Sequence, residues 1–329
     1  MTFLSALTLA TTGWAFGTAQ AAAPAPTGTH TTAVSAAEQR AALHFWTDER
    51  LRTARDMTTS PTTTATATAT AAEKAPHIQV PPLSAPATIT PNTPTPPSLR
   101  ASSPTAWTGD GLISTTAGKV FFQNASGGTF ACSATVANSD NRSVVLTAAH
   151  CVVNSGTGEV YRNWVFIPGY ANGNRPFGTF TASRLITDAQ YVSTAGNANW
   201  DFAFAVLGTV NGRTVGDTVG AEGIAFNSPT GRHVHSFGYG GSAAEGNGER
   251  LNHCEGDEFA DAGRPGSTMW GIDCVQTGGS SGGGFLADFN TGNGGGYLIG
   301  NISVSAGANE YHPTLGNEAL AAYRQAGAS

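Results

Sequence analysis

Three residue types that together support nucleophilic catalysis occur in distinctive strings of this sequence. His150 lies in Leu-Thr-Ala-Ala-His-Cys, Asp201 in Asn-Trp-Asp-Phe-Ala, and Ser281 in Gly-Gly-Ser-Ser-Gly-Gly-Gly. A hydroxyl is a weak nucleophile at neutral pH unless a base accepts its proton and a third group orients that base. Histidine, aspartate and serine suit these roles, and His-Asp-Ser is one of the chain orders in which such triads occur. We therefore take Ser281 as the candidate nucleophile, His150 as its base and Asp201 as the orienting acid.

Both His150 and Asp201 lie at the ends of strand-like runs. His150 follows residues 143–147, and Asp201 directly precedes the apolar run 202–207. A carboxylate at the mouth of a buried strand needs a partner, and Nδ1 of His150 would supply one. Each residue alone has a simpler interpretation, since single histidines are usually structural and Asp201 could belong to a turn.

The glycines around Ser281 suit a second catalytic requirement. Glycine allows backbone conformations that point successive N–H groups inward, and it lets a substrate carbonyl approach closely. We expect the N–H groups of Gly279 and Ser281 to form an oxyanion hole, and loss of one such donor typically costs ~10²–10³ in rate. A flexible Gly/Ser loop is the alternative for this string taken alone.

The four cysteines favour structural disulfides and an oxidising compartment. No pair has CxxC spacing, which argues against a metal site, so we expect no metal and no cofactor. A disulfide between Cys132 and Cys151 would staple the hairpin that presents His150. The remaining pair, Cys254 and Cys274, would then brace the loop that leads to Ser281.

From about Trp107 onward the chain is typical of an all-β protein. Short strand-like runs alternate with Gly, Asn and Pro turns, and no sustained helix–strand alternation supports a doubly wound α/β fold. A C-terminal helix is expected over residues 317–325, with Asn317 as its N-cap. The expected strands are residues 119–122, 143–147, 164–167, 202–207, 234–237 and 297–302.

The N-terminal third differs in composition. Residues 1–21 read as a signal peptide without the usual charged start, and residues 22–106 as a largely disordered propeptide and Thr/Ala/Pro-rich linker before a domain over 107–329. Within this region, residues 33–57 have helix-forming composition. They could form a propeptide helix that shields the folded enzyme, or a marginal helix without a partner. The amphipathic spacing rests on Ala42, Phe45, Trp46, Glu49 and Arg50.

Charge and hydropathy exclude several classes of partner. Charged residues make up 12% of the chain and the formal net charge is −6. The chain therefore lacks the excess of positive charge that is typical of proteins that bind nucleic acid or anionic membranes. Beyond the N-terminal segment, no run approaches the roughly 18 apolar residues of a membrane span. We expect a secreted monomer.

Taken together, the three motifs resemble those of the chymotrypsin/trypsin-like serine peptidases, and more closely their secreted bacterial, V8-like branch. The resemblance covers about Gly118 to the C-terminus, and the motifs agree in sequence, order and rough spacing. It implies two six-stranded antiparallel β-barrels with the triad in the cleft between them, and cleavage of polypeptide substrates through an acyl-enzyme. It also implies that residues 300–305 pair with the substrate backbone, and that Ser303 hydrogen-bonds the catalytic Asp201.

The chain departs from the family pattern in ways that concern activation. Ser280 stands where the family has the aspartate that pairs with a newly cut N-terminal amine, and no Ile-Val-Gly-Gly start is present. We therefore expect a zymogen activated by removal of a pro-segment that blocks the cleft.

The pocket residues suggest a substrate preference. Residues 275–277 supply no acid at the pocket base, and Ile302 replaces the histidine of glutamate-specific relatives. Ser305 and Thr314 would narrow the pocket, which favours small or medium apolar P1 residues. The candidate substrate-binding residues are Ser303, Val304, Ser305 and Thr314.

Other interpretations remain at the level of motifs. Residues 279–283 also match GxSxG of α/β-hydrolase esterases, but Asp288 follows Ser281 too closely for a βα unit before a distal His312. A catalytically silent, protease-like binding protein is a second alternative, although no triad member is missing. A metal site at His233, His235 and His253 is conceivable, but no nearby pair of carboxylates is evident from the sequence.

Overall fold

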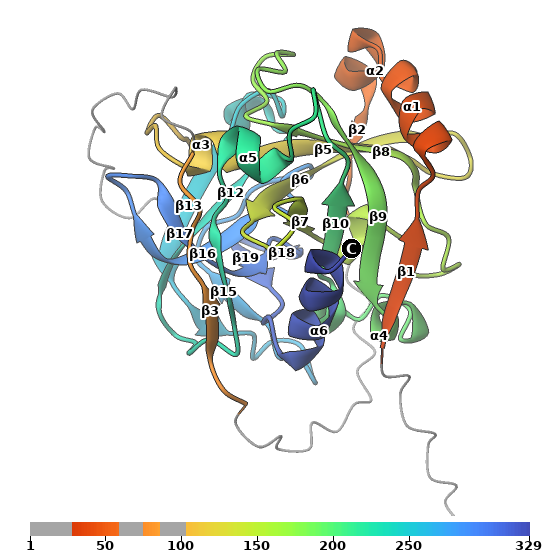
Figure 1. Ribbon diagram of the computed structural model, residues 1–329. Helices are drawn as coiled ribbons and strands as arrows, with labels where there is room; N and C mark the ends of the chain where they lie inside the picture. The colour runs from red at the N-terminus through yellow and green to blue at the C-terminus, as the bar shows by residue number, and fades with distance from the viewer. Residues whose placement is uncertain (1–27, 59–74, 86–102) are drawn as a thin grey trace, which may run out of the picture.

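The computed structural model describes residues 28–58, 75–85 and 103–329. The expected signal peptide, residues 1–21, and most of the Thr/Ala-rich and Pro-rich tracts lie outside the described residues. The described chain is mostly β-structure in two halves, with a C-terminal helix (Figure 1). None of its described helices is both long and apolar enough to span a membrane.

The first half is a closed six-stranded antiparallel barrel, as expected. Its strands pair in the ring β8–β5–β6–β7–β10–β9, and β9 returns to pair with β8. Neighbouring strands have their alternate side chains inside, so the ring encloses an apolar core. The bounds are β5 Ala117–Gln123, β6 Thr129–Ala137, β7 Val144–Thr147, β8 Arg162–Pro168, β9 Phe180–Asp188 and β10 Ala203–Leu207.

The second half holds its strands in two sheets around a separate core. The seven-stranded sheet has the order β3–β11–β17–β16–β12–β13–β4, and the four-stranded sheet has the order β14–β15–β19–β18. The Cys254–Cys274 disulfide and the apolar residues around it lie in the core of this half. The bounds are β3 Ile78–Val80, β4 Thr105–Ala106, β11 Gly223–Phe226, β12 His233–Gly238, β13 Asn252–Asp257, β14 Phe259–Ala260, β15 Trp270–Ile272, β16 Gly284–Asn290, β17 Gly295–Asn301, β18 Val304–Ala306 and β19 Asn309–His312.

An apolar cluster joins the two halves. It combines side chains of β7 and β10 with side chains of β11, β12, β16 and β17, and the C-terminal helix α6 (Asn317–Gly327) packs on it. The N-cap of α6 is Gly316, so the expectation that Asn317 caps the helix was wrong. Asn317 is the first helical residue, and its side-chain oxygen accepts a hydrogen bond from Asn227 instead.

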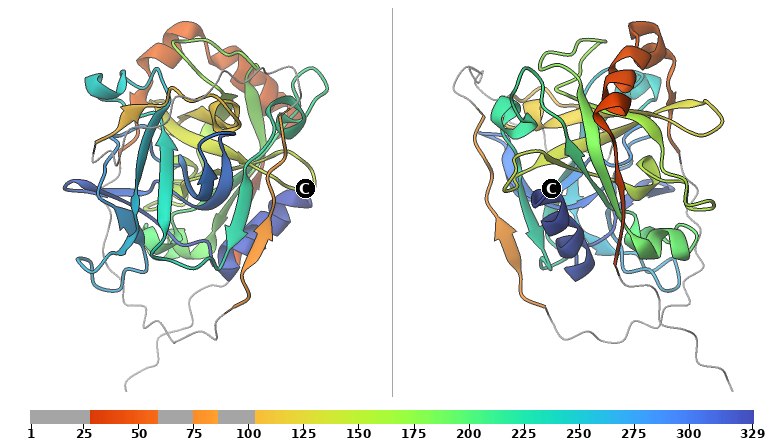
Figure 2. Two further views of the ribbon diagram at one scale, coloured as in Figure 1. Left: turned by 90° about the vertical axis from the view of Figure 1, so that its left-hand side faces the viewer. Right: turned by 45° about the vertical axis from the view of Figure 1, so that its right-hand side comes forward.

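Part of the N-terminal third packs on both halves. Strand β1 (Thr29–Ala33) pairs with β9, and helices α1 (Ala36–Phe45) and α2 (Asp48–Thr53) follow it over the first barrel (Figure 2). Trp46 is buried against Phe121, and its indole N–H donates to the Asn163 carbonyl. The helix expected within residues 33–57 is therefore present as two helices, and this part of the chain packs against the first barrel.

The remaining elements are short. Strand β2 (Arg55–Asp56) pairs with β6, and β3 adds to the second half beside β11. β2 falls within residues 33–57, which were expected to be helical, whereas β3 comes from the stretch that composition assigned to a linker. Ile78 and Val80 alternate along β3 and give it one partly buried side. The other helices are α3 Ile113–Thr116, α4 Ala189–Ser193 and α5 Val215–Val219, with 3-10 turns at Ala149–Cys151, Ala198–Trp200 and Ala243–Glu245.

Candidate active site

His150 and Asp201 meet at the end of the first barrel that faces the second half. His150 lies in the 3-10 turn directly after β7, and Asp201 lies two residues before β10, which pairs with β7. Nδ1 of His150 donates to Oδ2 of Asp201 at 2.7 Å, and the backbone N–H of His150 donates to Oδ1 at 2.9 Å. Both side chains are buried. The carboxylate therefore fixes both the position of the residue and the tautomer of its ring.

The other ring nitrogen of His150 is left for a different partner. Among the described residues, Nε2 of His150 is buried and has no hydrogen-bond partner. With Nδ1 carrying the proton, Nε2 has a free lone pair. Such an imidazole can accept a proton from a hydroxyl placed beside it.

The second half contributes two groups that hold Asp201. The Ser303 hydroxyl donates to Oδ2 at 2.6 Å, and the Asn301 side chain donates to the Asp201 backbone carbonyl at 3.0 Å. Because hydrogen bonds to an ionised acceptor are stronger than neutral ones, the Ser303 contact stabilises the charged carboxylate. The Asn301 contact holds the backbone of Asp201 in place. The contact between Ser303 and Asp201 matches the expectation for this residue.

The loop that carries Ser281 is tied to the first barrel. The Ser281 carbonyl accepts from the Ser133 N–H at 2.7 Å, and Sγ of Cys151 lies 3.7 Å from the same oxygen. Gly282 has a φ of +86°, and a Cβ there would lie 2.3 Å from the Ser133 carbonyl oxygen and from the Thr147 hydroxyl. The close approach of this loop to β6 and β7 therefore requires glycine at position 282.

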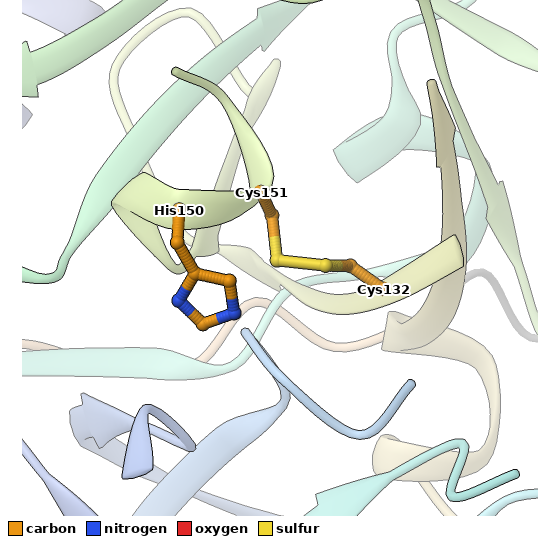
Figure 3. A group of neighbouring side chains, drawn as sticks. All are labelled: Cys132, His150 and Cys151. Atoms are coloured by element: carbon orange, nitrogen blue, oxygen red, sulfur yellow. A yellow bond between two sulfur atoms is a disulfide. The ribbon is translucent and has the colours of Figure 1, made fainter. Parts of the chain in front are cut away.

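The two disulfides have the expected pairing. Cys132–Cys151 joins β6 to the turn that carries His150, and Cys254–Cys274 joins β13 to the segment after β15 (Figure 3 shows the first). Although Cys132, His150 and Cys151 lie close enough to suggest a metal site, both sulfurs are in the disulfide. They are therefore not available as thiolate ligands.

The Gly279 N–H already has an acceptor in this structure. It donates to the Met57 carbonyl at 3.2 Å, and the Met57 N–H donates to the Ala131 carbonyl at 2.9 Å. Residues 55–58 thus run between β6 and the Ser281 loop, where Thr58 approaches Gly278. The segment lies across the candidate active site.

A pair of opposite charges accompanies this segment. Lys119 is buried on β5, and its ammonium group donates to the Gly248 carbonyl at 2.9 Å. Burial lowers the pKa of Lys119 and raises the pKa of Asp56, and the attraction between the two groups opposes both shifts. Sequence reasoning missed this pair, because Lys119 lies within an apolar strand and Asp56 lies far away in the N-terminal region.

The candidate substrate-binding residues Val304 and Ser305 lie on β18, whereas Thr314 lies in the segment between β19 and α6. Val304 and Ser305 pair with Tyr311 and Glu310 on β19, and the Ser305 hydroxyl lies 3.4 Å from the Gln276 carbonyl oxygen. The Thr314 carbonyl accepts a hydrogen bond from the N–H of Gly316, the residue before α6.

One buried acid near these residues escaped the sequence analysis. Glu310 accepts hydrogen bonds from the Ser236 hydroxyl and, at 2.9 Å, from the Gln276 N–H. Burial raises the pKa of Glu310 to about 7. Its position in the chain, far from residues 275–277, gave no sign that it would lie beside them.

The alternative esterase triad is not assembled. Asp288 is exposed and pairs with Arg232, whereas His312 is buried and pairs with Glu258 at 2.8 Å. The described sheets are dominated by antiparallel pairs, with short parallel contacts at β11–β17 and β2–β6 and one parallel bridge between Ala137 and Glu222. This architecture differs from an α/β-hydrolase.

Similar chains and folds occur among solved proteases. The protease Anisep from Arthrobacter nicotinovorans is 35% identical with a TM-score of 0.62, and the match covers 66% of this chain and 98% of that one. The thermostable serine protease AL20 from an extremophilic microorganism is 37% identical with a TM-score of 0.61 and the same coverage. A Glu endopeptidase at 18% identity, with a TM-score of 0.53 and coverage of 69% and 97%, shares the fold.

No family model matches the sequence, and no curated protein sequence matches it. The two bacterial enzymes are nonetheless matched along almost their whole length at more than a third identity. On that basis, the chain belongs to the bacterial chymotrypsin/trypsin-like serine proteases.

Proposed function

We propose that this protein is a secreted serine endopeptidase in which Ser281 is the nucleophile, His150 the general base and Asp201 the orienting acid. The observation that carries the proposal is the state of the His150 ring. Nδ1 is held by a buried carboxylate at 2.7 Å, while Nε2 is buried without a partner among the described residues. An imidazole held in this way is ready to accept the serine proton.

The chemistry then follows in two steps. The Ser281 oxygen attacks the substrate carbonyl as its proton moves to Nε2 of His150, and the negative charge that develops on the carbonyl oxygen is stabilised by the N–H groups of Gly279 and Ser281. The imidazolium gives its proton to the leaving amine, which leaves an acyl-enzyme. Water activated by the same ring releases the acyl group and restores the serine.

Asp201 contributes throughout both steps. Its charge favours the imidazolium that forms in each transition state, and Ser303 and Asn301 keep the residue in place. Two disulfides in the described chain support function in an oxidising, extracellular compartment. Polypeptides are the proposed substrates.

The proposed reaction can be tested with a fluorophosphonate probe on protein freed of its N-terminal region. We expect labelling at Ser281, no labelling of Ser281→Ala, and a loss of labelling in His150→Ala. Ser280→Ala, which changes the neighbouring hydroxyl, is the matched control and should still be labelled. Labelling that persists in Ser281→Ala would refute the assignment.

We also propose that the segment ending near Thr58 acts as an inhibitory pro-segment. The Met57 carbonyl uses the Gly279 N–H that the oxyanion needs, and Asp56 faces the buried Lys119. The solved relatives are matched by 66% of this chain, so about a third of the chain has no counterpart in that match. This supports a removable region, in keeping with Ser280 replacing the acid of the usual activating ion pair.

Inhibition by the pro-segment predicts that the uncut chain hydrolyses peptides slowly. Asp56→Ala should raise the activity of the uncut chain several-fold, because it removes the acid that is attracted to the buried Lys119. Glu49→Ala on α2, which removes an exposed acid outside the candidate site, is the control. Equal activity of the uncut chain and the processed enzyme would contradict the proposal, without bearing on the triad.

A further inference from the structure

A second group of histidines and carboxylates lies on one face of the β12–β13 hairpin, outside the active site. In the antiparallel register, His233 is opposite Asp257 and His235 is opposite Glu255. Because alternate residues of a strand point to the same side, these four side chains share one face. Val234, between the two histidines, points to the opposite face and into the core, as does Cys254 next to Glu255.

The spacing of three of these side chains suits a small metal ion. Nδ1 of His235 lies 3.4 Å from Oε2 of Glu255, and Nε2 of His233 lies 3.9 Å from the same oxygen. All three donor atoms lie within 4.8 Å of one another. A tetrahedral zinc ion with bonds of about 2.0–2.1 Å needs donor atoms about 3.3–3.4 Å apart, so small side-chain rotations would complete the site.

Asp257 sets the orientation of His233. Its Oδ1 accepts from Nδ1 of His233 at 2.8 Å, so Nε2 of the same ring is left as the lone-pair nitrogen on the side of Glu255. A carboxylate that holds the outer nitrogen of a ligating histidine is a common feature of zinc sites, because it fixes the tautomer and raises ligand basicity.

His235 is the more deeply placed ligand. Its Nδ1 also lies 2.8 Å from Nε2 of His253, so metal binding would replace that hydrogen bond.

The group is accessible from solvent. The side chain of His233 is 45% exposed, whereas those of His235 and Glu255 are 8% and 10% exposed. Phe289 packs beside the His235 ring and limits the opening on that side. An ion could therefore enter past His233 and keep one position for water.

We propose that His233, His235 and Glu255 form a zinc-binding site on the β12–β13 hairpin, with Asp257 as the residue that positions His233. Two imidazoles and one carboxylate favour Zn²⁺ over Mg²⁺ or Ca²⁺, which prefer all-oxygen ligands. The site lies outside the catalytic triad. A bound ion would cross-link the two strands of the hairpin.

Calorimetric titration of chelator-treated protein with zinc chloride tests the proposal. We expect one ion per chain, and at least tenfold weaker binding in both His233→Ala and Glu255→Gln. Asp257→Asn should weaken binding by about 10-fold or more, the range usual for such supporting carboxylates. Glu255→Gln keeps the shape of the side chain, so it remains informative if a histidine variant folds poorly.

The matched control is His44→Ala, which removes an exposed histidine from α1. It should leave zinc binding unchanged. The proposal is overturned if the wild type takes up no zinc, or if His233→Ala and Glu255→Gln bind zinc as the wild type does. Binding that depends on His44 would also overturn it.

Discussion

The candidate active site and the proposed hairpin site both combine histidines with carboxylates but are built in different ways. His150 and Asp201 come from the first barrel, whereas Ser281 and Ser303 come from the second half. By contrast, His233, His235, Glu255 and Asp257 come from two neighbouring strands of one hairpin.

This difference determines what each site depends on. The contacts of Ser303 and of the Ser281 loop with the first barrel depend on the apolar cluster that holds β7 and β10 against β16 and β17. The hairpin site needs only the local pairing of β12 with β13. We therefore expect changes at the contact between the halves to affect catalysis strongly, and changes within the hairpin to affect zinc binding and stability alone.

Asp201→Asn should have the largest effect, because it removes the charge on which both halves converge. An amide can present an N–H to His150 and favour the wrong tautomer, so we expect kcat/KM to fall by about 10⁴. The measurement is hydrolysis of a peptide substrate by processed enzyme. A loss of less than tenfold would show that Asp201 does not orient the base.

Glu310 connects the β12–β13 hairpin to the loop before Ser281. Its carboxylate accepts hydrogen bonds from the Ser236 hydroxyl on β12 and from the Gln276 N–H. Its folded pKa of about 7 exceeds the ordinary value of 4.5, so the folded chain binds more protons than the unfolded chain between these pH values. The free energy of unfolding should therefore fall by about 3 kcal/mol as pH rises from 4.5 to 7.

Glu310→Gln removes this titration and should flatten that part of the stability profile. Urea unfolding at a series of pH values provides the measurement. An unchanged pH dependence in the variant would mean that Glu310 is ionised in the folded protein at low pH, and that its burial has little energetic consequence.

Zinc should raise the stability of the chain without changing its peptidase activity, because the ion binds the folded hairpin and does not contact the proposed triad. At a free zinc concentration of 100 times Kd, the expected gain is about 2.7 kcal/mol. Thermal unfolding would show the gain, and kcat/KM on a peptide would stay constant. Zinc-dependent inhibition that persists in Glu255→Gln would point to binding at His150 instead.

Ser303→Ala should have the smallest effect of the four, since it removes one hydrogen bond to Asp201 and leaves the carboxylate in place. A hydrogen bond to a charged group contributes about 1.5 kcal/mol or somewhat more, so we expect kcat to fall about tenfold or somewhat more. KM should change little, and Ser303→Thr should restore part of the rate. Ser305→Ala, two residues further along the chain, provides the comparison; an equal loss of kcat there would remove the special role of Ser303.

Much of the fold was readable from local pattern. Each of the six expected strand runs matches a strand of the structure, from β5 to β17, with at most one residue outside the strand, because alternating or continuous apolar residues between turns have few other stable arrangements. Strands such as β6, β9 and β13 were missed, since Ser, Thr, Asn and Gly interrupt their apolar pattern. The ordered part of the N-terminal third was underestimated, because its buried residues are few and stand among polar ones.

The sequence alone determined which residues could do chemistry: the histidine, the aspartate and the glycine-embedded serine, with the cysteines that pair beside them. Only the tertiary structure decided which atoms meet. The Ser303 hydroxyl donates to the Asp201 carboxylate, and the Met57 carbonyl accepts from the Gly279 N–H. Glu310 accepts from the Gln276 N–H, and Glu255 and Asp257 lie opposite His235 and His233 in the hairpin. The physical reason is that strand register, barrel closure and the packing of the halves bring together residues far apart in the chain, and local periodicity carries no information about such contacts.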